Sequence, residues 1–224
     1  MAEKEKGAQR PVKPEQIQDS LRLDIVTRMY KDGDKLVESD IAQKYGASRG
    51  SVRSALAALE SEGLVRMLPN GRKEVVGFTV KQVCDMYELR WMMENRALEL
   101  AIENRTTFFS PLLTVLRTIE QKMKAPEGVD WYGIDIEFHR ALVMTSGNYP
   151  LLKAWDINTP VMYALMQLNT SQGYRERYVQ ELYEKHRRIF ELLVTDNLEC
   201  YALLREHIMD AQEISLQVLS RYGE

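Results

Sequence analysis

Hydrophobic residues recur at helical spacing near the start of the chain. Ile17, Leu21, Ile25 and Met29 follow one another at i, i+4 intervals. This spacing puts all four on one face of an amphipathic helix, and Pro14 suits its first turn. The first element is therefore expected to be a helix that buries this face.

Two shorter helices are expected next, over about residues 38–45 and 49–61. Gly46 interrupts the pattern between them, and Gly63 ends the second one. Ser48 is well placed as an N-cap, because a serine side chain accepts a hydrogen bond from the backbone amides of a first helical turn. So short a connection between two helices is typical of a helix-turn-helix.

The pattern then changes from helical to alternating. Residues 64–68 and 74–78 are expected to form two strands, joined by a tight turn at residues 69–72. Three helices followed by a two-stranded wing is the order of a winged helix-turn-helix, in which the third helix enters the major groove of DNA. We therefore expect a DNA-binding domain over residues 14–78.

From Thr79 onward every pattern is helical. Thr79 and Gln82 have the spacing of a capping box, which opens the first helix of this part. Helices are expected over about residues 79–104, 110–124, 129–146, 150–169, 173–194 and 198–221. The fold class is thus expected to be mainly α, with a C-terminal all-α antiparallel helical bundle over residues 79–224.

Composition also indicates where in the cell the protein is expected to be. No apolar run approaches the ~18 residues that a membrane span needs. The charged first residues contain no secretory signal, so residues 1–13 are expected to be a disordered arm. Cys84 and Cys200 are expected to be reduced thiols rather than a disulfide. Together these features indicate a cytoplasmic protein with no membrane partner.

Charge differs between the two parts of the chain. Residues 1–78 carry 14 Lys and Arg against 12 Asp and Glu, a net charge of +2, and the remainder carries 16 against 21, a net charge of −5. This difference favours an anionic partner for the first part only.

The start of the third helix carries the side chains best suited to DNA. Arg49 and Arg53 are i, i+4 and share a face, opposite the apolar Val52 and Leu56. A guanidinium group fits guanine N7 and O6 or clamps a phosphate. The candidate DNA-contacting residues, with two from the wing tip, are Ser48, Arg49, Ser51, Arg53, Gly71 and Arg72. The alternatives are merely solvated arginines or a winged domain that binds protein.

The three histidines of the chain fit one level of the helical part. Asp135 and His139 are i, i+4, about 6 Å apart on one helix face. His186 lies ten residues before Asp196, in the turn between the last two helices, and His207 lies eleven after it. An antiparallel pair would place these two side by side, and bundles build metal sites from such inward side chains. Three histidines and an aspartate suit a divalent metal ion, with zinc or nickel favoured over manganese, cobalt or iron. The alternatives are hydrogen-bonded core histidines and a local Asp–His ion pair.

Residues 35–78, KLVESDIAQKYGASRGSVRSALAALESEGLVRMLPNGRKEVVGF, resemble the DNA-binding domain of GntR-family transcription regulators. The resemblance includes Gly46-Ala-Ser-Arg49, Val52-Arg-Ser-Ala-Leu56 and Leu59 to Val65. It implies that Arg49, Arg53 and Gly71 contact operator DNA.

Residues 79–221 resemble the FCD effector domain of the FadR subfamily of these regulators, a bundle of six or seven helices. The matching motifs include Leu89-Arg90, Asp135-x-x-Phe138-His139 and Gly147-Asn148. The resemblance implies that a metal ion is held by Asp135, His139, His186 and His207. It also implies a small organic-acid effector, for which Arg90 and Asn148 are the candidate ligands. The alternative roles are an Arg90–Glu94 salt bridge and an Asn148 N-cap.

These features together predict a homodimeric DNA-binding transcription regulator, a repressor whose affinity for double-stranded operator DNA is controlled by a small carboxylate at the metal site. An enzyme is not expected. The alternatives are a metalloenzyme that activates water at the His₃Asp site, and a regulator whose metal is purely structural.

Overall fold

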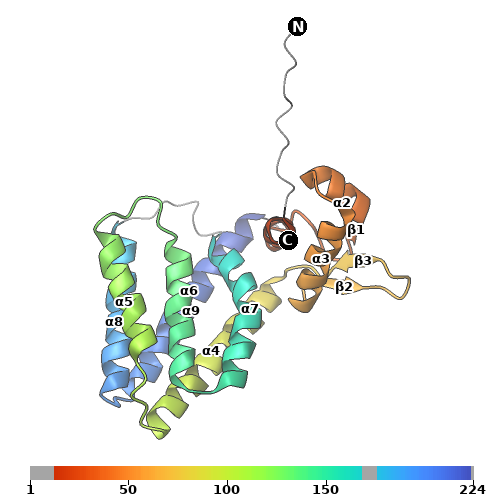
Figure 1. Ribbon diagram of the computed structural model, residues 1–224. Helices are drawn as coiled ribbons and strands as arrows, with labels where there is room; N and C mark the ends of the chain where they lie inside the picture. Colours follow the sequence, from red (N-terminus) through yellow and green to blue (C-terminus); the bar gives the residue numbers. More distant parts are fainter. Residues whose placement is uncertain (1–12, 168–175, 223–224) are drawn as a thin grey trace. The chain divides into compact units, whose positions relative to one another are not determined.

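The computed structural model describes residues 13–167 and 176–222. The chain forms two compact units that divide between Phe78 and Thr79 (Figure 1). The predicted disordered arm lies outside the described residues, apart from Lys13. Each unit is described separately.

The first unit contains three helices and a small sheet. Its elements are α1 (Pro14–Val26), β1 (Lys35–Leu36), α2 (Glu38–Tyr45), α3 (Arg49–Ser61), β2 (Val65–Met67) and β3 (Lys73–Val75). The three predicted helices and the hairpin are confirmed. The wing, however, is a three-stranded antiparallel sheet of order β1-β3-β2, rather than two-stranded. The added strand has only two residues, too few to show a period, and it forms because Lys35 pairs with Glu74 on β3.

The core of the first unit is built from the predicted apolar faces. Ile17, Leu21 and Ile25 are fully buried, and α1 packs against α3. Met29 is the exception, because it is exposed and lies beyond the end of α1. The chain leaves the helix at Arg28, whose φ of 59° is left-handed, so the i, i+4 pattern does not continue to Met29.

Every regular element among the described residues of the second unit is a helix. They are α4 (Val80–Glu103), α5 (Ser110–Met123), α6 (Trp131–Thr145), α7 (Tyr149–Gln167), α8 (Glu176–Val194), α9 (Glu199–Leu219) and a 3₁₀ turn at Ser220–Tyr222. The mainly α fold class is confirmed. The expected end of one helix at residues 168–169 and the expected start of the next at 173–175 lie outside the described residues.

Four helices of this unit close a ring around one point. Helix α6 packs against α4 and α8, and α9 packs against the same two helices (Figure 1). Thr79 and Gln82 form the expected capping box at the start of α4. Side chains from four helices therefore meet inside this ring. Among the described residues, no helix is both long and apolar enough to span a bilayer, and Cys84 and Cys200 are free thiols.

Candidate functional site

Three helices bring the four predicted metal ligands together inside this ring. Helix α6 contributes Asp135 and His139, α8 contributes His186, and α9 contributes His207. All four side chains are buried, and one candidate ligand atom from each lies within 4.8 Å of all the others. The chain therefore contains a buried Asp/His₃ group that is able to hold a metal ion.

The spacing of the donor atoms fits a single small cation. The Oδ1 atom of Asp135 lies 3.0 Å from the Nε2 atom of His186, 3.6 Å from that of His139 and 3.8 Å from that of His207. The His207 Nε2 atom lies 3.1 Å from its counterpart on His139 and 3.2 Å from that on His186. Four donors held tetrahedrally about 2.0–2.2 Å from zinc are roughly 3.3–3.6 Å apart. The observed separations run from 3.0 to 3.8 Å and so span this range.

One buried atom at the centre lacks a partner. Asp135 Oδ1 is inaccessible to solvent and has no hydrogen-bond partner among the described residues. Leaving a buried carboxylate oxygen unsatisfied is costly. Three imidazole nitrogens face the same point, and neutral imidazoles and a carboxylate are the donors that first-row divalent metals prefer. The donor set thus fits a divalent ion.

The protonation states also suit metal binding. Burial lowers the pKa of His186 to about 3, and burial likewise lowers the pKa of His207. Burial alone would raise the pKa of Asp135, but the three imidazoles close to its Oδ1 atom hold that pKa well below its usual range. At neutral pH these three groups are already in the deprotonated forms that metals bind.

The buried Arg90–Glu94 ion pair on α4 contacts the candidate metal centre through His139. Glu94 Oε2 lies 2.6 Å from Nδ1 of His139, and Glu94 Oε1 accepts a hydrogen bond of 2.8 Å from Nε of Arg90. A carboxylate on the outer nitrogen fixes the orientation of a ligating imidazole. Although burial alone would lower the pKa of His139, Glu94 and Asp135 raise it overall. The sequence indicated Glu94 as a salt-bridge partner for Arg90 and not as a partner of His139. Its position on the buried face of α4 was the signal that it could also contact the site.

The two predicted effector residues lie in different surroundings. Arg90 is buried, and its guanidinium lies 5.9 Å from the ring centre of Trp155. The Trp155 Nε1 atom is buried and has no hydrogen-bond partner within residues 13–167 and 176–222. Asn148 is half-buried, and its Oδ1 accepts a 3.1 Å hydrogen bond from the backbone N–H of Leu151 in the first turn of α7. Both alternative roles considered from the sequence, the salt bridge and the helix cap, are therefore present.

In the first unit, the predicted DNA-contacting residues occupy one end of α3 and the wing turn. The Ser48 hydroxyl accepts a 3.0 Å hydrogen bond from the Ser51 backbone N–H and caps α3. Arg49 and Arg53 are exposed, opposite the buried Val52 and Leu56. Gly71 and Arg72 lie exposed in the turn between β2 and β3, where Gly71 has a φ of 77° that suits glycine.

Arg53 has a partner that the sequence did not indicate. Its guanidinium donates to both carboxylate oxygens of Glu38 on α2, at 3.2 and 3.0 Å. This exposed, two-pronged contact orients the Arg53 side chain near the start of the helix. If Arg53 contacts DNA, either Glu38 orients the Arg53 side chain for that contact, or the Arg53–Glu38 pair must break.

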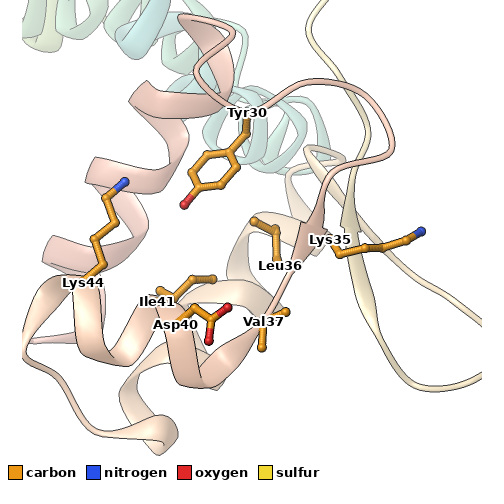
Figure 2. Close-up of a pocket in the computed structure, with 7 residues that line it drawn as sticks. All are labelled: Tyr30, Lys35, Leu36, Val37, Asp40, Ile41 and Lys44. Carbon is orange, nitrogen blue, oxygen red and sulfur yellow. The ribbon is translucent and has the colours of Figure 1, made fainter.

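A small pocket in the first unit is a poor candidate for an effector site. It has a volume of about 210 Å³ and is lined by Tyr30, Lys35, Leu36, Val37, Asp40, Ile41 and Lys44 (Figure 2). Ligand pockets usually measure about 300–1,000 Å³. Figure 2 shows Lys35 and Lys44 on opposite sides of the pocket. Lys44 is already paired with Asp24 at 2.8 Å, and Lys35 is paired with Glu74.

Two family descriptions match this chain. "Bacterial regulatory proteins, gntR family" matches residues 13–75, and "FCD domain" matches residues 85–210. The chain belongs to the GntR family of bacterial regulators. Its FCD domain is consistent with the FadR subfamily, as the residue motifs predicted.

Individual relatives support this assignment to the GntR family. It is 27% identical to the gluconate operon transcriptional repressor of Bacillus licheniformis over 159 residues, which span 70% of this chain and 65% of that repressor. Its fold is similar to that of Lar, described as controlling expression of the Listeria monocytogenes agr system, with a TM-score of 0.68, 16% identity and coverage of 94% and 98% of the two chains. A solved structure described as a metal-free FCD domain has a TM-score of 0.54 and 20% identity, covering 65% of this chain and 99% of its own. The chain is thus a DNA-binding transcriptional regulator and not an enzyme.

Proposed function

We propose that this GntR-family chain is a cytoplasmic repressor whose affinity for operator DNA is set by a small carboxylate bound at a metal ion. The observation that carries the proposal is the buried convergence of Asp135, His139, His186 and His207, with ligand atoms within 4.8 Å of one another. The relative named as a repressor of the gluconate operon supports both the repressor role and an organic-acid effector.

The metal would serve as the anchor for the effector. A divalent ion, with zinc or nickel favoured over manganese, cobalt or iron, would supply the largest local positive charge, to which an anion would be attracted. Asp135 neutralises part of that charge, and Glu94 holds the His139 ring in place. Because all four ligands are buried, a bound ion would attract an anion in a low-dielectric environment.

Buried donors close to the ligands would bind the carboxylate. The guanidinium of Arg90 is charged and buried, and the Trp155 N–H has no partner in the part of the chain that the structure describes. The ring of Trp155 lies 6.5 Å from that of His139, measured between centroids. A carboxylate that accepts from Arg90 and Trp155 would satisfy both donors. Asn148 would contribute only through its side-chain NH₂ group, since its oxygen caps α7.

The first unit would read DNA as one half of a homodimer. Two copies of α3 related by a two-fold axis suit a pseudo-palindromic operator. Arg49 and Arg53 would reach base edges or phosphates. The contacts to the backbone and flanking groove would come from Ser48, Ser51, Gly71 and Arg72.

The test is operator affinity measured at fixed salt while small organic acids are titrated, before and after chelation, with bound metal quantified by elemental analysis. The metal-loaded wild-type protein is expected to change its operator affinity at least tenfold with one class of acid. His186→Ala should lose the metal and this response while keeping the fold of the first unit, and the exposed Arg187→Ala on the same helix should keep both. Failure of every acid to alter operator affinity would overturn the proposal.

A purely structural metal is the second candidate, and the complete burial of His139 and His186 favours it. In that case chelation would unfold the second unit, whereas added acids would leave DNA binding unchanged. The same titration therefore separates the two candidates.

A further inference from the structure

Arg53 on α3 is held by a carboxylate along one edge of its guanidinium. Its Nε atom donates to Oε1 of Glu38 at 3.2 Å, and its Nη2 atom donates to Oε2 of the same residue at 3.0 Å. Glu38 is the first residue of α2, so the contact joins the start of one helix to the exposed side of the other. Two parallel hydrogen bonds fix the plane of a guanidinium as well as its position.

The contact leaves the other edge of the guanidinium available for DNA. A guanidinium carries five N–H donors in a rigid fork, and Glu38 accepts from two of them. On the far edge Nη1 and Nη2 present one N–H each, and this pair matches the O6 and N7 acceptors of guanine. The Arg53 side chain is still 70% exposed with the Glu38 contact in place. Arg53 can therefore contact Glu38 and a guanine at the same time.

Glu38 is a negative charge within a positive surface. Hydrogen bonding from Arg53 lowers the pKa of Glu38, and the charges of Arg49 and Lys73 lower that pKa further. The carboxylate is therefore ionised at neutral pH and lies within electrostatic reach of three cations. A carboxylate in this position repels phosphates, so it weakens DNA binding that depends on charge alone.

Helix stability alone does not account for the contact between Glu38 and Arg53. An acid in the first turn of a helix is favoured by the helix dipole, and α2 has a second acid, Asp40, in that turn. Asp40 accepts a 3.0 Å hydrogen bond from the adjacent Ser39 hydroxyl, whereas Glu38 accepts from another helix. The two acids thus share a charge and a helical turn but differ in their partners.

We propose that Glu38 is the positioning residue that makes Arg53 a reader of guanine. It holds one edge of the guanidinium so that the other edge meets O6 and N7 in the major groove, and an arginine held in advance loses less side-chain freedom on contact. The charge of Glu38 also disfavours sites without the guanine, because no base contact there offsets its repulsion of phosphates. The inference rests on the DNA contact that the proposed function assigns to Arg53, and it adds the base that is read and the residue that orients the reader.

The test uses a duplex that the full-length chain selects from a pool of random sequences, together with every single-base variant of that duplex. Arg53→Ala is expected to lose discrimination at one base pair, which contains a guanine. At that base pair Glu38→Gln should lower the preference for guanine roughly tenfold, because an amide has one acceptor oxygen and no charge with which to hold the guanidinium. Binding of a random-sequence duplex should rise about threefold in Glu38→Gln, since a charge that repels phosphates is removed.

Asp40→Asn is the matched control. It removes the same charge from the same turn of α2, but from an acid that accepts from Ser39 rather than from Arg53. The preference for guanine at the Arg53 position should stay as in the wild-type chain. Fluorescence anisotropy at fixed salt measures the affinities of all variants, and circular dichroism checks that each keeps its helices.

A double-mutant cycle separates the two effects of Glu38. In an Arg53→Ala background, Glu38→Gln should no longer change base discrimination, because the side chain that Glu38 orients is absent. The rise in random-sequence binding should persist in that background, because it depends on the charge of Glu38 itself.

Stronger binding of the selected duplex by Glu38→Gln, with undiminished preference for guanine, would overturn the inference, since DNA would then have to break the Arg53–Glu38 pair. Unchanged discrimination in Glu38→Gln, together with lost discrimination in Arg53→Ala, would also overturn it but leave the Arg53 contact of the proposed function intact. If Arg53→Ala discriminates like the wild-type chain at every base pair, the inference and that contact fail together.

Discussion

At the scale of single residues, Glu94 connects the candidate metal centre to the rest of the bundle. It accepts from Arg90 on one side and contacts the His139 ring on the other. Burial opposes its ionisation, but His139 and Arg90 lower its pKa below the usual value for a glutamic acid. Glu94 is thus a charged acceptor that holds a ligand in one orientation.

Replacing this carboxylate with an amide should weaken the site without removing a ligand. Glu94→Gln is expected to lower metal affinity about 10–100-fold, the usual cost of losing such an outer partner. Competition with a chelator measures the change, and Glu88→Gln, exposed on the same helix, is the control. Unchanged metal affinity in Glu94→Gln would show that the contact with Glu94 does not affect how His139 binds the metal.

At the scale of elements, α3 combines a buried face with a polar end. Val52, Leu56 and Leu59 are fully buried, while Arg49 and Arg53 remain exposed on the other side. The Ser48 cap closes the start of the helix, where backbone N–H groups favour an anion. Removing an arginine should therefore change DNA binding without changing the packing.

Arg49→Ala and Arg53→Ala are each expected to weaken operator binding by about 1–3 kcal/mol. If the lost contact is to a phosphate, the slope of log affinity against log salt should fall by about 1; if it is to a base, discrimination at one position should relax. Arg117→Ala, an exposed position on α5, should match wild type. Full operator affinity in both α3 variants would show that this end of the helix does not read DNA.

At the scale of the whole molecule, the buried histidines link the stability of the second unit to pH. In the unfolded chain a histidine has a pKa of about 6.5, whereas burial lowers the pKa of His186 to about 3 in the folded chain. Between these values the unfolded state binds more protons, so stability rises with pH and is complete above about 6.5. The raised pKa of His139 acts in the opposite sense, and only above that value.

Metal-stripped protein should therefore lose stability when the pH falls from 6.5 to 5, by up to about 1.4 kcal/mol per pH unit for each such histidine. Urea unfolding of the second unit at several pH values measures this slope. His186→Gln should show a shallower dependence, because one titrating group is removed. A pH-independent midpoint in wild type would show that these imidazoles are not held neutral.

Local periodicity was sufficient to predict most of the fold. Apart from the two helix ends predicted within residues 168–175, the helices of both units and the wing hairpin begin and end within a few residues of their predicted positions, because capping and apolar spacing act over a few residues. Met29 shows the limit of the method, since one left-handed residue, Arg28, ended a pattern that the spacing alone would have continued.

The sequence by itself determined the domain types and the meeting of the four candidate ligands. Asp135 and His139 share a helical turn, and His186 and His207 lie ten residues before and eleven residues after Asp196 in one tight connection. Only the tertiary structure decided the partners of these residues. Glu94 reaches His139 across 45 positions and β1 joins β3 across 39, because such contacts depend on how helices and strands pack and not on the spacing within any one of them.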